Sequence, residues 1–545
     1  MPKNSARSLK PVTEKSDNMK PNKIFPLLML LAAAVLPTAC DRELVQDEEF
    51  AAQVPADNDA DAGTWALVPN GPVTSITQVA LAAPAATTSD AYQQELADIK
   101  AEQARLTSAQ RKAVAYWNAG GVLRWNRFMR ELVARYALAP APALDGTYPI
   151  PDSENPFSDP VFPFSNPPYS ARAYSYVSVA QYEALKMAWH YKYLYNRPAP
   201  SQVDAGVQAL VPDTGLPAYP SEDAVLSAVT AELLKVLFPT AVEEITKMAA
   251  EQRNAARWAG KAAPSDISAG LAFGKSVAAL FTARAAGDGM RNAVGTKAQW
   301  AVLADTARNH LIKAGRSVEG EIFWQSLDGP PRPPMLPFFG NVRPWIQTNV
   351  QLNALRPGPP PSTSSPEMTE ELEEVRHYSE NPTRERYRIV HSWADGAGTY
   401  TPPGHWNDIA AEYIYDARFS EVRAARAFAL LNMALHNAAV GCWETKYYYY
   451  NPRPSQLDPA IKTLTGLPNF PSYPSGHSTF SAAAAEVLSY LFPAGAADFA
   501  AWRDEASLSR LYGAIHYRTD TEAGKTHGQS IGAVAVQFAG TDGAD

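Results

Sequence analysis

The stretch Lys446-Tyr447-Tyr448-Tyr449 repeats an earlier one, Lys192-Tyr193-Leu194-Tyr195, at an offset of 254 residues (446 minus 192). Further pairs align at the same offset without a gap: Ser201-Gln202 with Ser455-Gln456, Tyr219-Pro220-Ser221 with Tyr473-Pro474-Ser475, Leu237-Phe238-Pro239 with Leu491-Phe492-Pro493, Gly270 with Gly524, and Gly274 with Gly528. Self-similarity at a fixed offset is typical of a duplicated structural unit. The sequence therefore predicts two copies of one fold.

Both copies show apolar residues at three- and four-residue spacing, whereas convincing runs of alternating β-branched residues are absent from the sequence. That spacing is typical of amphipathic helices. We therefore expect an all-α protein built as two tandem related helical bundles. The expected divisions are a degenerate N-terminal bundle at 96–290, a proline-rich connection at 291–385, and a C-terminal bundle at 386–545 that carries the active site.

The composition limits the classes of function. With 545 residues, of which 46% are apolar, the chain can bury a large core. The formal net charge is −8, and no stripe rich in Lys and Arg alternates with aromatic residues. A nucleic-acid groove needs such a stripe, so nucleic acid is not an expected partner.

The N-terminus has the order of an export signal. Lys20 and Lys23 precede an apolar run at 24–36, which ends in small residues and Cys40. The run is short for a membrane-spanning helix, and Met19 is a plausible true start. Leu36-Pro37-Thr38-Ala39-Cys40 resembles a lipobox displaced by one position. We predict export to the periplasm or cell envelope with a lipid anchor on Cys40; ordinary cleavage that removes Cys40 is the alternative.

The segment after the signal, residues 41–95, is predicted to be a flexible tether, because it is rich in Ala, Asp, Pro and Thr with little periodicity. The only cysteine besides Cys40 is Cys442, so an intramolecular disulfide would have to join these two.

The second copy carries a set of residues suited to an oxyanion: Lys446, Arg453, Ser475, Gly476, His477, Arg510, His516 and Asp520. One lysine and two arginines supply charge-assisted donors to several oxygens. Pro474 followed by Ser475-Gly476 indicates a helix start, where free backbone N–H groups and the helix dipole favour an anion. Glycine also lets the backbone approach a ligand closely.

His516 and Asp520 lie four residues apart and therefore share a face if they are on one helix. The carboxylate can then accept the Nδ1 proton of the imidazole, which leaves Nε2 as a nucleophile or metal ligand. In the first copy the chemistry is missing: Ala199, Glu222, Asp223, Ala256 and Ala262 stand at the positions of Arg453, Gly476, His477, Arg510 and His516. Lys192 and Asp266 persist, which indicates that Lys446 and Asp520 serve packing or helix ends as well.

In order and spacing, these residues resemble the signature of the superfamily that contains the type 2 phosphatidic acid phosphatases (PAP2), bacterial acid phosphatases and vanadium haloperoxidases. The stretches at 391–396 and 401–406 look like those of its bacterial haloperoxidase-like branch. Vanadium chloroperoxidases of this superfamily have two related helical bundles with the site in the second, so the resemblance implies that architecture here.

The resemblance implies the following roles. His516 is the axial ligand of vanadate, or the nucleophile that forms a phosphohistidine; His477 is the acid/base; and Asp520 orients His516. The equatorial oxygens are held by Lys446, Arg453, Ser475, Gly476 and Arg510, and Lys446 also polarises bound peroxide. Trp443 and Phe470 are the pocket aromatics, with core packing as the alternative. Asn437 falls where haloperoxidases often have an acid that pairs with the site arginine, which puts the tuning of Arg510 in doubt.

The expected function is vanadate-dependent oxidation of halide by hydrogen peroxide. The alternatives are an acid phosphatase that uses no cofactor and acts on a phosphate monoester, and a non-catalytic surface lipoprotein. A homodimer is left open, and the membrane is an expected partner only through a lipid anchor. Four further histidines are expected to be structural: His391, His405, His436 and His527.

Overall fold

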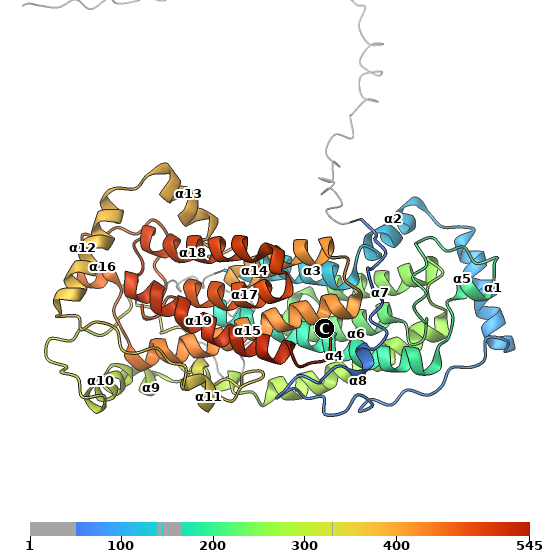
Figure 1. Cartoon of the computed structure of the whole chain (residues 1–545), viewed down its shortest axis with the longest axis horizontal. Helices are drawn as coiled ribbons and strands as arrows, with labels where there is room; N and C mark the ends of the chain where they lie inside the picture. The colour runs from blue at the N-terminus through green and yellow to red at the C-terminus, as the bar shows by residue number, and fades with distance from the viewer. Residues whose placement is uncertain (1–50, 139–143, 145–165, 330, 545) are drawn as a thin grey trace, which may run out of the picture. The chain divides into compact units, whose positions relative to one another are not determined.

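A computed structural model describes residues 51–138, 144, 166–329 and 331–544, and no β-strand occurs in these ranges. The predicted all-α class is confirmed. Residues Phe50–Asp545 belong to one compact unit (Figure 1). The predicted signal and Cys40 lie outside the described residues. No helix in the described part is long and apolar enough to cross a membrane.

The repeat reappears in the helix bounds. Its paired helices are α4 (Pro167–Tyr195) with α15 (Glu421–Tyr449), α5 (Pro200–Val203) with α16 (Pro454–Leu457), α6 (Glu222–Leu237) with α17 (Gly476–Leu491), α7 (Val242–Trp258) with α18 (Ala496–Tyr512), and α8 (Pro264–Ala286) with α19 (Arg518–Ala539). The long helices α4 and α15 pack against each other. The two copies thus share one core, and their division into separate bundles stays a prediction.

Glycines explain how closely the paired helices approach. A Cβ at Gly524 would lie 2.8 Å from the Ser475 carbonyl oxygen, and one at Gly528 would lie 2.1 Å from that of Thr479. The first copy has the same arrangement, with Gly270 and Gly274 on α8 facing backbone of α6. Only glycine allows this contact, which brings the start of α19 against the start of α17. Figure 1 shows α15, α17, α18 and α19 gathered in one region.

The described part of the predicted tether is packed rather than free. Residues 51–89 contain only the short η1 (Ala62–Thr64), but Trp65 and Val68 are buried. Tyrosine hydroxyls of the first copy donate to backbone carbonyls of this segment, as Tyr195 does to Leu81 at 2.7 Å. The tether prediction is therefore wrong for residues 51–95, which end in α1 (Asp90–Gln103). Composition did not reveal that a few scattered apolar residues dock the segment.

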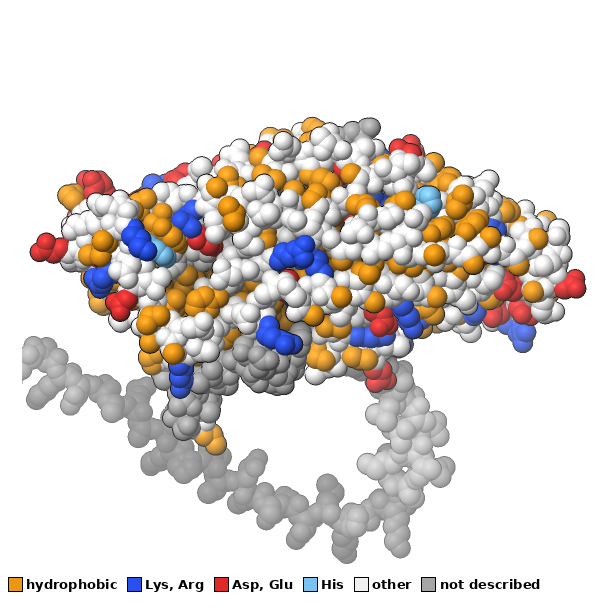
Figure 2. Space-filling view, turned by 90° about the horizontal axis from the view of Figure 1, so that it is seen from below, with side chains coloured by type: hydrophobic (Ala, Val, Ile, Leu, Met, Phe, Trp, Pro, Cys, Tyr) orange, Lys and Arg blue, Asp and Glu red, His pale blue; other side chains and the backbone are white. Residues whose placement is uncertain are grey.

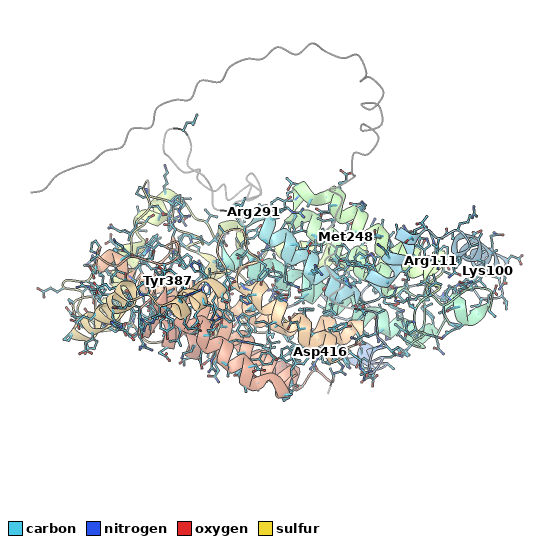
Figure 3. All side chains as sticks on the ribbon, turned by 90° about the horizontal axis from the view of Figure 1, so that it is seen from above. Lys100, Arg111, Met248, Arg291, Tyr387 and Asp416 are labelled. Atoms are coloured by element: carbon cyan, nitrogen blue, oxygen red, sulfur yellow. The ribbon has the colours of Figure 1, made fainter. Side chains whose placement is uncertain are left out.

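The predicted connection at 291–385 is built of short helices and buried anchors. It contains α9 (Lys297–Ala301), α10 (Leu303–Lys313), η5 (Phe339–Asn341), α11 (Asn349–Asn353) and α12 (Pro366–Glu380), and α13 (Arg384–Ser392) follows. Trp324 and Trp345 are buried and fix it to the core. Figure 3 shows Tyr387 of α13 and Lys100 of α1 far apart on the described body.

The remaining helices are α2 (Ser108–Trp117), α3 (Gly121–Tyr136) and α14 (Thr401–Asp416). Both α3 and α14 pack against α4, and α14 also packs against α17. On the face seen in Figure 2, hydrophobic side chains are interspersed with polar surface and with charges of both signs.

Candidate active site

The structure brings the predicted oxyanion residues together from several elements. Lys446 lies near the end of α15, Arg453 just before α16, and Ser475, Gly476 and His477 at the start of α17. Arg510 lies near the end of α18, and His516 and Asp520 at the start of α19. All are buried except His477, whose side chain is 16% exposed. The residues at 475–477 and 516–520 meet because the helix glycines bring α17 and α19 together.

His516 is held through both ring nitrogens. Nδ1 lies 2.8 Å from Oδ2 of Asp520, and Nε2 accepts a hydrogen bond from Nη1 of Arg453 at 2.9 Å. Burial, reinforced by the charge of Arg453, lowers the pKa of His516 well below its ordinary value. The imidazole is therefore neutral, with its proton on Nδ1 and a lone pair on Nε2. This is the state that a nucleophile or metal ligand requires.

Asp520 has two tasks. Its Oδ2 also accepts from the Tyr517 backbone N–H at 3.1 Å, which caps α19, and from the Ser472 hydroxyl. Burial raises the pKa of Asp520 to about 6. Its counterpart Asp266 similarly accepts from the Ala263 N–H at 2.7 Å. The helix-end role inferred from the repeat is visible in both copies, and the contact with histidine is made by Asp520.

Arg453 has one nitrogen left for a ligand. Nε donates to the Phe470 carbonyl at 3.0 Å, and Nη1 donates to the Ile515 carbonyl at 2.8 Å as well as to His516. Nη2 is buried and has no hydrogen-bond partner among the described residues. Burial lowers the pKa of Arg453 to about 10, so it stays charged at neutral pH. A buried, charged, unpartnered donor is costly unless something accepts from it.

The Lys446 ammonium donates its hydrogen bonds to backbone carbonyls of the protein. Its ammonium donates to the carbonyls of Pro471, Ser472 and Pro474 at 3.0, 2.8 and 2.5 Å. Burial lowers the pKa of Lys446 to about 7, but three carbonyl acceptors match the three hydrogens of the charged form and favour it. Lys446 therefore fixes the loop that leads into Ser475.

The start of α17 is open to a ligand. The Ser475 hydroxyl caps the helix by accepting from the Ser478 N–H at 3.4 Å, as Ser221 caps α6. A Cβ at Gly476 would meet only the rings of Trp443 and Phe480, at 3.8 and 3.9 Å. Protein packing alone does not demand glycine there. His477 Nε2 is buried without a hydrogen-bond partner in the described chain, and burial lowers its pKa well below the ordinary value.

Arg510 shows what the sequence analysis missed. Its Nη2 donates to the Trp393 carbonyl at 2.7 Å, and Asp395 is the acid whose charge favours the charged form of Arg510. Burial nevertheless lowers the pKa of Arg510 to about 10. Asp395 Oδ2 also lies 4.0 Å from Nε2 of His477. The acid that acts on the site arginine is thus Asp395, which lies in the stretch 391–396 and is not among the predicted site residues.

Asn437 contacts Trp345 of the connection segment. Its side chain accepts from the Trp345 N–H at 2.9 Å and donates to the Trp345 carbonyl at 2.6 Å, so it anchors the connection segment. Spacing along the sequence could not reveal this role, because the acid that acts on Arg510 is Asp395, in the loop before α14.

The two aromatic residues lie beside the cationic groups. The rings of Trp443 and Phe470 are 4.9 Å apart, and Lys446 Nζ lies 5.0 Å from the Phe470 ring. Trp443 also donates from its indole to the Met335 carbonyl at 3.2 Å. Among the other histidines, His436 and His527 are buried, and His391 is exposed on α13. Cys442 is a buried free thiol.

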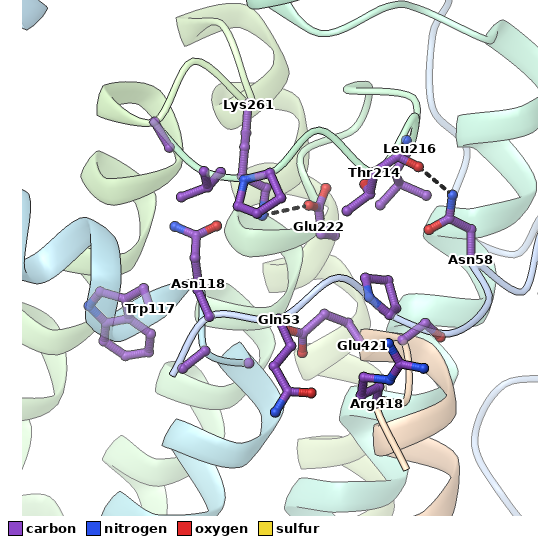
Figure 4. Close-up of a pocket in the computed structure, with 18 of the residues that line it drawn as sticks. Gln53, Asn58, Trp117, Asn118, Thr214, Leu216, Glu222, Lys261, Arg418 and Glu421 are labelled. Carbon is purple, nitrogen blue, oxygen red and sulfur yellow. Dashed lines mark hydrogen bonds and ion pairs between the residues drawn. The ribbon is translucent and has the colours of Figure 1, made fainter. Parts of the chain in front are cut away.

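In the first copy, an ion-pair cluster occupies the position that corresponds to the site. Glu222, at the position of Gly476, pairs with Lys192 at 2.7 Å and with Lys261 at 3.1 Å. Burial raises the pKa of Glu222, but the charges of the two lysines outweigh burial and lower it to about 2. Figure 4 shows Glu222, Lys261 and Glu421 around a cavity at this place. A side-chain carboxylate thus stands at the position where the second copy has glycine and no side chain.

One family profile and several solved structures are similar to this chain. Residues 426–543 match the sequence profile of the PAP2 superfamily. No curated protein matches the chain. A solved structure described as the first bacterial vanadium-dependent iodoperoxidase is similar, with a TM-score of 0.55 and 22% identity over 76% of this chain and 96% of that chain. A holo-type bacterial vanadium-dependent chloroperoxidase gives a TM-score of 0.49 and 13% identity over 71% and 96%. The first similarity shows a shared fold.

Proposed function

We propose that this chain, which belongs to the PAP2 superfamily through residues 426–543, is a vanadate-dependent haloperoxidase-like enzyme that oxidises halide with hydrogen peroxide. The observation that carries the proposal is the state of His516. Its Nε2 lone pair faces Nη1 of Arg453 at 2.9 Å, while Nδ1 is held by Asp520. A neutral imidazole beside fixed cations is what a five-coordinate oxyanion needs.

The residues present fit vanadate. The unpartnered Nη2 of Arg453 is a buried donor without an acceptor in the described chain, and the space beside Gly476 is limited only by aromatic rings. His516 Nε2 would bind the metal, and Arg453, Arg510 and the N–H groups at the start of α17 would hold its oxygens. Ser475 would add a hydroxyl. Bound vanadate would supply the activation of hydrogen peroxide towards halide.

The chain's own residues would provide order and proton transfer. The overall reaction converts halide, hydrogen peroxide and one proton into hypohalous acid and water. His477, whose Nε2 is unpartnered among the described residues and whose pKa is lowered by burial, would take a proton from the entering peroxide and return it to the leaving oxygen. Lys446 holds the 471–474 loop, and Asp520 keeps the Nε2 lone pair of His516 directed into the site.

Phosphate-ester hydrolysis is the second candidate, because the same geometry would bind phosphate and would place His516 Nε2 for attack on it. The preference for a haloperoxidase rests on the duplicated architecture, on Trp443 and Phe470 beside the cations, and on the fold shared with an iodoperoxidase.

Two assays on the same protein distinguish the candidates. Bromide and iodide oxidation by hydrogen peroxide is measured with and without orthovanadate, beside hydrolysis of a chromogenic phosphate monoester. His516→Ala is the test variant, and His377→Ala is the control, because His377 is exposed on α12 and its ring contacts Asn381 and Tyr378 rather than site residues. We expect vanadate-dependent oxidation that only His516→Ala abolishes. Phosphate release inhibited by vanadate, without halide oxidation, would make the chain a phosphatase. No activity in either assay, together with no vanadate binding, would favour a non-catalytic protein.

A further inference from the structure

A second histidine, besides His477, lies close to the Asp395 carboxylate. His405, on α14, approaches the Asp395 carboxylate with Nδ1 at 3.1 and 3.2 Å from its two oxygens. The ring of His405 also stacks on Trp393, with centroids 4.3 Å apart. The carbonyl of the same Trp393 accepts from Arg510. Residues 393–395 therefore connect His405 to both Arg510 and His477.

The backbone conformation at Asp395 is unusual, as expected for a residue with a specific role. Its φ is +44°, in the left-handed region that Asp and Asn tolerate better than most other residues. The carboxyl side chain is only 6% exposed and has His405 on one side and His477, at 4.0 Å, on the other. A buried acid shared by two imidazoles and an arginine must divide its charge among them.

We propose that His405 is a positioning residue of the active site, which acts through Asp395 to set how strongly the Arg510 region attracts an oxyanion. The inference rests on the oxyanion site of the proposed function. A protonated His405 neutralises Asp395, and the cations of the site then act on the anion in full. A neutral His405 leaves the Asp395 charge beside Arg510, where it repels the anion.

The surroundings of His405 fit a titrating group. Besides Asp395, the charged or titratable groups that act on it are Asp408 of its own helix, Arg130 of α3, Tyr400, whose ring is 5.9 Å away, and His477 of α17. Arg130 forms an ion pair with Asp408, so these two largely cancel. Burial opposes the charge on His405, but the hydrogen bond and charge of Asp395 outweigh it and raise its pKa. His405 is therefore charged in acid and loses its charge as pH rises through this raised pKa.

Sulfate is the probe, because it is a tetrahedral oxyanion whose own charge is constant from about pH 5 to 8, the range in which histidine titrates. Its dissociation constant is measured by calorimetry on the full-length protein and on His405→Gln, which keeps a donor for Asp395 without titrating. The ratio of the two constants at each pH removes the contributions of Lys446 and Asp520, which both proteins share. His377→Gln is the control, because His377 is an exposed histidine on α12 outside the 393–395 segment.

We expect the unmodified protein to bind sulfate about threefold to tenfold more tightly than His405→Gln in acid, with the ratio approaching one as pH rises and His405 loses its proton. Asp395→Asn, which keeps the backbone preference, should bind more tightly throughout and should remove the effect of His405→Gln. A ratio that does not change with pH would overturn the inference, as would an unchanged His405 effect in the Asp395→Asn background. Absence of any sulfate binding would instead count against the oxyanion site itself.

Discussion

His516 and Asp520 form the unit on which the site chemistry depends, and the repeat offers a control for it. Asp520 holds Nδ1 of His516 at 2.8 Å, whereas Asp266 pairs with Arg197 at 3.2 Å in the first copy. Both acids are buried at helix starts. Their structural surroundings are similar, but only one of them orients an imidazole.

Asp520→Asn should therefore weaken vanadate binding by about 10- to 100-fold, because the second partner of a metal-bound histidine fixes its tautomer and basicity. Vanadate affinity, measured by calorimetry, is the readout. Asp266→Asn should lower stability without changing that affinity. Equal losses of vanadate affinity in the two variants would mean that the effect is only structural.

Lys446 holds the 471–474 loop that leads to Ser475, so its removal should affect both stability and oxyanion binding. Lys446→Met leaves the carbonyls of Pro471, Ser472 and Pro474 without their donor. We expect the free energy of unfolding to fall by about 3 kcal/mol, since each unsatisfied buried carbonyl is costly. Urea denaturation measures this loss, and vanadate affinity should fall in the same variant. Unchanged affinity in a destabilised protein would restrict Lys446 to the loop.

At the scale of helices, the glycines common to both copies have a packing role that the sequence could not reveal. Gly528→Ala would place a Cβ 2.1 Å from the Thr479 carbonyl oxygen, and Gly274→Ala would place one 2.5 Å from that of Val225. Each should lower the free energy of unfolding by about 1 to 3 kcal/mol or more through overpacking. Only Gly528→Ala should also reduce oxyanion affinity, because it separates α19 from α17. Loss of affinity in Gly274→Ala would contradict this assignment.

Helix positions could be predicted from the sequence where a repeat or a motif marked them. The offset of 254 residues, found from Lys192 and Lys446, also relates the starts of α6 and α17, Glu222 and Gly476. The role of Asp395 was not predictable, because its approach to His477 joins residues far apart in the chain with no spacing rule. The docking of residues 51–89 was missed for a similar reason: Trp65 and Val68 are isolated apolar residues in a polar composition.

At the scale of the whole molecule, one copy carries the candidate chemistry and the other has replaced it with an internal ion-pair cluster around Glu222. The two copies are also joined directly by Glu421, the first residue of α15. Its carboxylate accepts from the Gly121 and Val122 N–H groups at 2.6 and 2.9 Å, at the start of α3. An acid of the second copy thus caps a helix of the first.

This junction should make stability depend on pH. Burial raises the pKa of Glu421 from 4.5 to about 7, although the two N–H groups of α3 oppose the shift. Because the folded protein holds this proton more tightly than the unfolded chain, the contribution of Glu421 is fully present below the unfolded pKa and is lost as pH rises through about 7. Glu421→Gln cannot titrate. The amount by which the thermal midpoint of the unmodified protein exceeds that of this variant should therefore decrease steadily from acid to above neutral pH. Scanning calorimetry over that range measures it. A difference that stayed constant, or grew with pH, would show that the carboxylate is ionised throughout and that the two N–H donors outweigh burial at this junction.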